Sequence, residues 1–204
     1  MSIIYSILKF LIKQAQALFE FVPNYVILTL FRVNYASFPD IRGVIFIRNH
    51  GLIKIGEKVI FNCKLSANPV GGPYETSLCV SEGASLIIGS NVGISSTAII
   101  CNVGISIGSN TKIGSGCRIY DTDFHSIDFF QRCESVDLTV KELPVSIGEG
   151  VFIGAGSIVL KGVTIGDYSI IGAGSVVSKN IPANEIWAGN PAKFIRKLSD
   201  SKLI

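Results

Sequence analysis

The chain has 204 residues, of which 48% are hydrophobic and 16% are charged, and its formal net charge at pH 7 is +3. This length and composition allow one domain with a sizeable core and exclude a disordered chain, and so small a charge gives no reason to expect a nucleic-acid partner. The five cysteines are odd in number and form no CxxC pair. That usage argues against a disulfide framework or a zinc finger, so we expect free thiols in a reducing cytoplasm.

Residues 1–45 form an apolar N-terminal segment that begins with a predicted helix. Apolar residues recur at helical spacing as far as Val22, and Pro23 then stops or kinks the helix. Charged and amide side chains interrupt the apolar run, so it is a poor membrane span, and it lacks the basic start and cleavage site of a signal peptide. Two interpretations stay open for residues 1–22: packing on the protein's own body or a sister subunit, and peripheral contact with a membrane surface.

A six-residue repeat dominates the rest of the chain. Residues 147–182 read as six consecutive hexads, IGEGVF, IGAGSI, VLKGVT, IGDYSI, IGAGSV and VSKNIP, each opening with Ile or Val and most with Gly second. Such a hexad predicts one side of a three-sided coil, in which a short strand turns its opening residue inward and glycine relieves crowding at the corner. Three hexads make one coil, so Ile147 should stack on Ile165 and Ile153 on Ile171.

The same phase extends toward the N-terminus and is interrupted twice. Its further openings, with a slip of one residue in the middle, are Ile88, Ile94, Ile100, Ile107, Ile113 and Ile119. We expect coils over residues 46–186, with excursions at 66–81 and 121–144, where Pro, Gly, polar or aromatic residues break the phase. Within the first excursion, residues 71–74 (GGPY) are placed to cover a bound acceptor. Residues 187–204 form a C-terminal tail.

The second excursion carries the residue best suited to proton transfer. His125 lies at its root among aspartates, and an exposed histidine beside carboxylates suits a general base near pH 7. A flanking carboxylate would fix the tautomer through Nδ1 and leave Nε2 for a substrate hydroxyl. On these residues alone, a surface histidine in a polar loop is the alternative. The other histidine, His50, has no carboxylate or cysteine closely flanking it, and we expect it to be structural.

Three features in this order resemble the hexapeptide-repeat acetyltransferases: the hexads, the His125-Ser126-Ile127-Asp128 segment, and the ending from Ala188 to Leu198. The resemblance covers roughly residues 50–198 and is strongest to the capsular or O-antigen polysaccharide and the maltose or galactoside O-acetyltransferases. It implies an all-β fold, a left-handed parallel β-helix with an N-terminal helix and a short C-terminal helical tail. It also implies a homotrimer with active sites between subunits.

The resemblance further implies an acetyl-CoA-dependent O-acetyltransferase without a metal, acting on a sugar hydroxyl in surface-polysaccharide biosynthesis. His125 would be the general base of a direct transfer, with a backbone amide stabilising the oxyanion. We expect the enzyme in the cytoplasm, at the inner face of the cytoplasmic membrane if residues 1–22 contact it.

Candidate binding residues follow from the motif positions. The cofactor contacts carried over from the family are Phe152, Ala155, Ala173 and Ser178 along the pantetheine arm, with Lys193 and Arg196 at the 3′-phosphate. Lysine keeps the charge but loses the bidentate contact of the arginine found in some relatives, and a solvated basic tail is the alternative for both. The acceptor candidates are Ser96, Thr97, Asn102 and Asp123. The coil before His125 lacks the aspartate of galactoside-type relatives, which counts against a simple galactoside acceptor.

Three other functions compete with this one. An N-acetyltransferase for an amino-sugar nucleotide would share the coil and the CoA site. A zinc enzyme of the γ-carbonic-anhydrase type needs three histidines, and this chain has two. A non-catalytic solenoid scaffold would bind no CoA at its basic tail.

Overall fold

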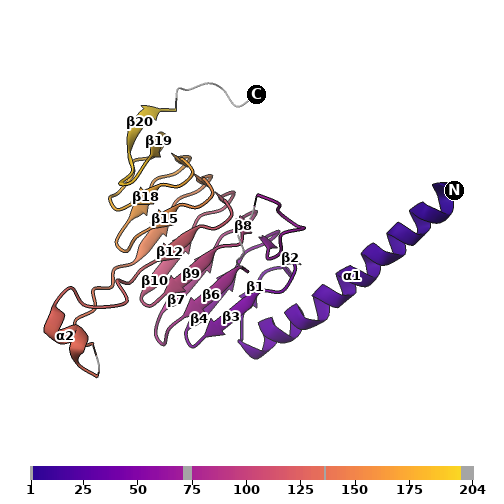
Figure 1. The fold of residues 1–204 in the computed structure, drawn as a ribbon, viewed down its shortest axis with the longest axis horizontal. Helices are drawn as coiled ribbons and strands as arrows, with labels where there is room; N and C mark the ends of the chain where they lie inside the picture. Colours follow the sequence, from indigo (N-terminus) through magenta and orange to yellow (C-terminus); the bar gives the residue numbers. More distant parts are fainter. Residues whose placement is uncertain (1, 71–74, 136, 199–204) are drawn as a thin grey trace.

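A computed structural model describes residues 2–70, 75–135 and 137–198. A long helix, α1 (Ser2–Leu30), extends away from a stack of short strands, and a loop carrying α2 (Phe129–Cys133) projects from the stack elsewhere (Figure 1). Residues 71–74, which we expected to cover an acceptor, lie outside the described residues. Among the described helices, none is both long and apolar enough to cross a membrane.

The strands form three parallel sheets that the chain visits in turn. The first sheet contains β1 (Asn34–Tyr35), β4 (Leu52–Ile55), β7 (Ser85–Ile88), β10 (Gly104–Ile107), β13 (Val145–Ile147) and β16 (Thr164–Ile165). The second contains β2 (Asp40–Arg42), β5 (Ile60–Asn62), β8 (Gly93–Ser95), β11 (Lys112–Ile113), β14 (Phe152–Ile153), β17 (Ile170–Ile171), β19 (Glu185–Ala188) and β20 (Lys193–Lys197). The third contains β3 (Phe46–Asn49), β6 (Ser77–Val80), β9 (Ala98–Cys101), β12 (Arg118–Tyr120), β15 (Ile158–Val159) and β18 (Val176–Val177). The fold is a left-handed parallel β-helix, as expected: the hexads predicted the three-sided coil, and the family resemblance implied its left hand.

The hexad openings form the core. Ile147 pairs with Ile165 and Ile153 with Ile171 in register, as predicted, and all four side chains are buried. Burying an isoleucine side chain contributes about 1.5–3 kcal/mol, so the stacked columns supply most of the driving force. Small residues near the corners satisfy the backbone, as where the buried Ser157 hydroxyl donates to the Gly154 carbonyl at 2.8 Å.

One predicted core position was wrong. In β9 the inward residue is Ile99, which is fully buried and pairs with Ile119, whereas Ile100 is half-buried and outside the core. The corner before β9 is one residue shorter than the hexad requires. Its left-handed residue, Ser96 with φ of 43°, stands two positions after Ile94, whereas the left-handed Gly116 of the next coil stands three positions after Ile113.

Two boundaries also differ from the expected ones. β1 and β2 already pair with β4 and β5, so the first coil begins at Asn34 rather than at residue 46. The first excursion ends before Ser77, where β6 begins, although we had extended it to residue 81. The second excursion runs between β12 and β13, as expected, and Asp128 caps its helix α2.

The prediction of a short helical tail was wrong for the described part of the tail. β19 and β20 form an antiparallel hairpin, and the chain reverses at Gly189, whose φ of 104° a side chain would disfavour. The hairpin extends the second sheet, so the tail's backbone groups find partners at the sheet edge. A helix of five residues would close few hydrogen bonds of its own.

Candidate active site

His125 stands on the outgoing leg of the second excursion and faces a fixed carboxylate. Its side chain is 75% exposed, and Nδ1 lies 3.9 Å from Oδ2 of Asp137, whose side chain is only 14% exposed. The same oxygen accepts the Ser126 amide at 2.6 Å, which holds the Asp137 carboxylate in place. A carboxylate on the Nδ1 side favours the tautomer with its proton on Nδ1. Nε2 is then the proton acceptor of the ring.

The residue before His125 is held in an unfavourable backbone conformation. Phe124 has a φ of 65°, in the left-handed region that an aromatic residue rarely adopts. Its amide donates to the Thr122 hydroxyl at 3.1 Å, and its ring packs edge-on against Tyr120 with centroids 5.0 Å apart. These contacts fix the sharp turn that presents His125 to solvent, and strain of this kind concentrates at functional sites.

Polar contacts tie the base of the excursion to the coil below. Asn102 donates from its side-chain amide to Oε1 of Glu142 at 2.7 Å and accepts the Ser81 hydroxyl at 2.8 Å. Asp123 is paired with Lys161 at 2.6 Å. The structure therefore brings two acceptor candidates, Asn102 and Asp123, to the same corner as His125, where the chain passes from the third sheet to the first.

The other two acceptor candidates lie at the opposite end of β9, where the chain passes from the second sheet to the third. Thr97 is fully buried, and its hydroxyl donates to backbone carbonyls, including that of Ser95 at 2.8 Å. The prediction that Thr97 binds the acceptor was wrong, because its buried hydroxyl already donates to carbonyl groups of the coil. Ser96 lines a cavity of about 530 Å³ together with Glu75 and Arg118.

Four cofactor candidates lie along the second sheet and its corner with the third. Ala155 and Ala173 occupy successive turns of that corner, joined by a 2.8 Å hydrogen bond from the Gly174 amide to the Ala155 carbonyl. Phe152 opens β14 with its ring 48% exposed. A chain of strand pairings through Ile170 and Ile186 links Phe152 to Arg196 on β20, and this arrangement gives a long ligand an apolar start and a cationic end.

Of the two remaining cofactor candidates, Lys193 also lies on the second sheet and Ser178 lies elsewhere. Lys193 opens β20 and is exposed. Ser178 follows β18, so it lies at the corner between the third and first sheets, on the side of His125 and away from Ala173. Within one chain, the third sheet thus separates His125 and Ser178 from most of the cofactor candidates.

Three residues of this region were not predicted from sequence. Asp137, Glu142 and Lys161 each hold a predicted residue, but they lie 12, 40 and 38 positions from the residues they contact. The excursion has no periodicity, so no spacing rule points to Asp137. The contact of Lys161 could have been predicted. Its hexad, residues 159–164, passes the same corner of the coil at which the excursion with Asp123 begins.

Burial raises the pKa of four of the cysteine thiols, those of Cys63, Cys79, Cys101 and Cys117, which keeps them protonated. Burial raises the pKa of the Cys101 thiol to about 12, and the nearby Asp121 contributes to the rise. Cys133 is exposed on α2, and the described cysteines are free. His50 is exposed at the corner after β3. Within the described residues, no group of three or more His, Cys, Asp and Glu side chains is arranged to hold a metal.

Comparison with known proteins places the chain in a family. Residues 144–179 match the family model described as bacterial transferase hexapeptide (six repeats). A putative acetyltransferase of Schizosaccharomyces pombe is 45% identical over 96 residues, which cover 47% of this chain and 44% of that protein. Nodulation protein L of Rhizobium leguminosarum bv. viciae is 44% identical over 131 residues, 64% of this chain and 67% of that protein. The chain thus spans less than half the length of the first of these relatives.

A further relative and two solved structures match most of the chain. The putative lipopolysaccharide biosynthesis O-acetyl transferase WbbJ of Escherichia coli K12 is 31% identical, over 82% of this chain and 83% of that protein. A maltose O-acetyltransferase from Clostridium difficile 630 has a TM-score of 0.54 and 28% identity, covering 84% of this chain and 72% of that one. A point mutant of AntD, an N-acyltransferase from Bacillus cereus in complex with dTDP and coenzyme A, has a TM-score of 0.64 and 25% identity, with coverages of 83% and 87%. The hexads, the three sheets and these matches together show that the chain belongs to the hexapeptide-repeat transferase family.

Proposed function

We propose that this chain is an acetyl-CoA-dependent O-acetyltransferase that acetylates a sugar hydroxyl in surface-polysaccharide biosynthesis. The observation that carries the proposal is His125, exposed on a strained turn with the Asp137 carboxylate on its Nδ1 side. Similarity to WbbJ and to a maltose O-acetyltransferase supports a hydroxyl acceptor on a sugar. Because acetyl-CoA is the donor, we place the reaction in the cytoplasm.

In the proposed reaction His125 transfers a proton in each of two steps, the attack of the hydroxyl and the departure of CoA. Nε2 takes the proton of the sugar hydroxyl as the hydroxyl oxygen attacks the thioester carbonyl. The Asp137 carboxylate stabilises the imidazolium that results. As the carbon–sulfur bond breaks, the imidazolium returns the proton to the departing CoA sulfur, and the acetyl ester is complete. A backbone amide would stabilise the oxyanion between these steps.

A homotrimer would complete the site. In one chain the third sheet separates His125 from Phe152, Ala155 and Ala173. We place the His125 corner of one subunit against the cofactor edge of the next, as a closed ring of three identical interfaces allows. CoA would then lie along the corner at Ala155 and Ala173, with its 3′-phosphate near Lys193 and Arg196.

The acceptor would enter beside His125. Asn102 and Asp123 lie at that corner, although each is already engaged with Glu142 or Lys161. A sugar hydroxyl would have to share those polar atoms. The third remaining acceptor candidate is Ser96 of the neighbouring subunit. It lines a cavity at the cofactor edge of that subunit.

A second candidate function is N-acylation of an amino-sugar nucleotide. It is favoured by similarity to AntD, an N-acyltransferase whose structure contains dTDP and CoA. The two are separated by CoA release from acetyl-CoA with matched acceptors that differ only in bearing a hydroxyl or an amine. We expect release with the hydroxyl compounds. Release with the amines alone would replace our proposal by the second candidate, and no release with either would contradict both.

A further inference from the structure

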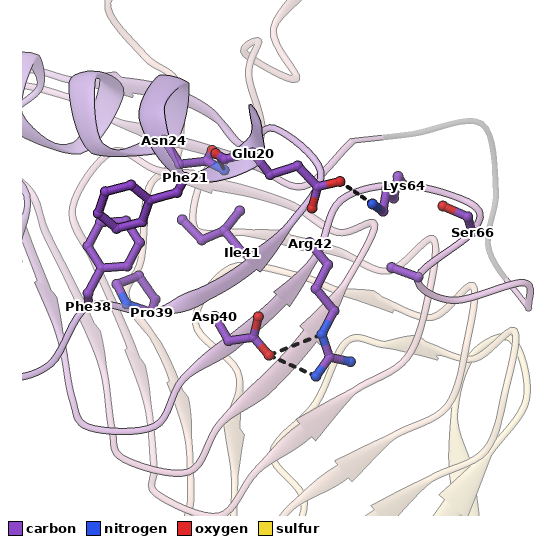
Figure 2. A pocket seen from close by; sticks show the side chains of 11 residues that line it. Glu20, Phe21, Asn24, Phe38, Pro39, Asp40, Ile41, Arg42, Lys64 and Ser66 are labelled. Atoms are coloured by element: carbon purple, nitrogen blue, oxygen red, sulfur yellow. Dashed lines mark hydrogen bonds and ion pairs between the residues drawn. The ribbon is translucent and has the colours of Figure 1, made fainter. Parts of the chain in front are cut away.

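The helix α1 is attached to the solenoid through Leu28, which is buried in the core, and through two polar side chains nearer its N-terminus. Asn24 is buried, and its side-chain amide donates to the Gly43 carbonyl at 2.8 Å while Oδ1 accepts the Ile45 amide at 3.1 Å. One turn earlier, Glu20 pairs with Lys64 and accepts the Gly43 amide at 3.0 Å. Figure 2 shows Glu20 and Asn24 reaching from the helix toward the first coil, beside a cavity of about 840 Å³.

Away from these contacts, many described side chains of α1 are apolar and exposed. Phe19 is 86% exposed and Phe21 46%, although two positions along a helix lie roughly 200° apart around its axis. The exposed apolar side chains of α1 are Tyr5, Ile7, Leu8, Phe10, Leu18, Phe19, Phe21, Val22, Tyr25, Val26 and Leu30. A helix of a globular protein turns its apolar stripe toward the core. Among the described apolar side chains of α1, only Leu28 is buried in the core, with Ile27 packed against it, and the helix extends away from the strands (Figure 1).

The charge of α1 indicates what covers this surface. Residues 2–19 contain Lys9 and Lys13 and no aspartate or glutamate, and the first acidic residue, Glu20, is already paired with Lys64. By helical periodicity, positions 9 and 13 fall on the same face as positions 20 and 24. A broad apolar surface with lysines on the remaining face matches an anionic lipid surface, in which the apolar side meets the acyl chains and lysines reach the headgroups.

The width of the apolar surface argues against a second copy as the covering partner. Contact with one neighbouring helix buries a stripe on the order of 100° wide, which is narrower than the arc of roughly 160° between Phe19 and Phe21 on the side away from Glu20. A lipid surface covers a wide arc at once, because an interfacial helix sinks about 5–10 Å into the headgroup region. We propose that α1 is an interfacial helix that docks this chain on an anionic lipid bilayer, with the solenoid on the water side.

Sedimentation of the full chain with vesicles tests this proposal. Vesicles of phosphatidylcholine with phosphatidylglycerol should bind the chain, and added salt should weaken the binding. Phe19→Asp should lower the partition coefficient by roughly tenfold or more, since it removes a large apolar side chain from the contact. The matched control is Phe130→Asp on α2, where the ring is 76% exposed; it should bind as the unaltered chain does.

Two further measurements separate lipid from other partners. Replacing Lys9 and Lys13 by Gln should reduce the preference for anionic over pure phosphatidylcholine vesicles by about fivefold per lysine. The mass of the assembly by light scattering should be the same for Phe19→Asp and the unaltered chain. The proposal is overturned if the unaltered chain does not sediment with anionic vesicles, or if Phe130→Asp loses as much binding. A lower assembly mass for Phe19→Asp would overturn it in favour of a second copy.

Discussion

At the residue scale, Asp137 lies on the Nδ1 side of His125, and in the proposed reaction it orients the imidazole. Asp137 acts through His125, as a positioning residue, so Asp137→Asn should lower kcat by less than the roughly 10²–10⁴-fold expected from loss of a general base. KM for acetyl-CoA should stay unchanged. An unchanged kcat would show that Asp137 only supports the loop.

Asp121 is the residue on which the base of the excursion depends. It is fully buried, and its carboxylate accepts the amides of Asn102, Val103 and Gly104 at 2.7, 2.8 and 2.8 Å. Asp121→Ala would leave three amides without their partner, so we expect a loss of about 3 kcal/mol or more in the free energy of unfolding. Urea denaturation measures it. The control, Asp128→Ala, removes an exposed helix cap and should cost about 1 kcal/mol; equal losses would contradict the assigned role.

At the element scale, Glu20 links pH to the attachment of α1. Burial alone would raise the pKa of the Glu20 carboxyl, but hydrogen bonds from Lys64 and the Gly43 amide, with the charge of Lys64, outweigh it and lower the pKa below the usual 4.5. A lowered pKa contributes stability that is present above the unfolded value and is lost as pH falls through the folded value.

Thermal unfolding of the unaltered chain and of Glu20→Gln between neutral and acid pH checks this linkage. The unaltered chain should be the more stable at neutral pH, and the difference should shrink as pH falls below about 4.5. Glu57→Gln, at an exposed glutamate of the second coil, should show no such trend. A difference between the chain and Glu20→Gln that is constant with pH would mean that the ion pair does not hold the helix.

How well each element could be predicted depended on its periodicity. The core columns at Ile147 and Ile153 follow from spacing alone, because each hexad repeats the same local chemistry. Ile100 was misplaced because the corner before β9 lacks one residue of the hexad, which the pattern does not reveal. Asp137 was missed because an excursion without a repeat brings residues together by its own folding. The ending after Gly189 was read as helical because a few residues do not distinguish a helix from a hairpin strand.

At the scale of the whole molecule, the site is expected to need two subunits. Two inactive variants should therefore complement each other when mixed and reassembled: His125→Ala, and a variant in which Ala173→Trp blocks the cofactor corner. In a closed trimer, random mixing should restore about a quarter of the unaltered activity, since each site takes one residue set from each neighbour. Activity no higher than that of the separate variants would place the whole site within one chain.

The most direct measurement compares the two histidines of the chain as alanine variants. Both His125 and His50 are exposed and lie at corners between the third and first sheets, so burial and fold position are matched. With acetyl-CoA and a hydroxyl acceptor that supports turnover, His125→Ala should lower kcat by roughly 10²–10⁴-fold, while His50→Ala keeps the rate of the unaltered chain. An undiminished rate in His125→Ala, or an equal loss in both variants, would contradict the assignment of His125 as the general base.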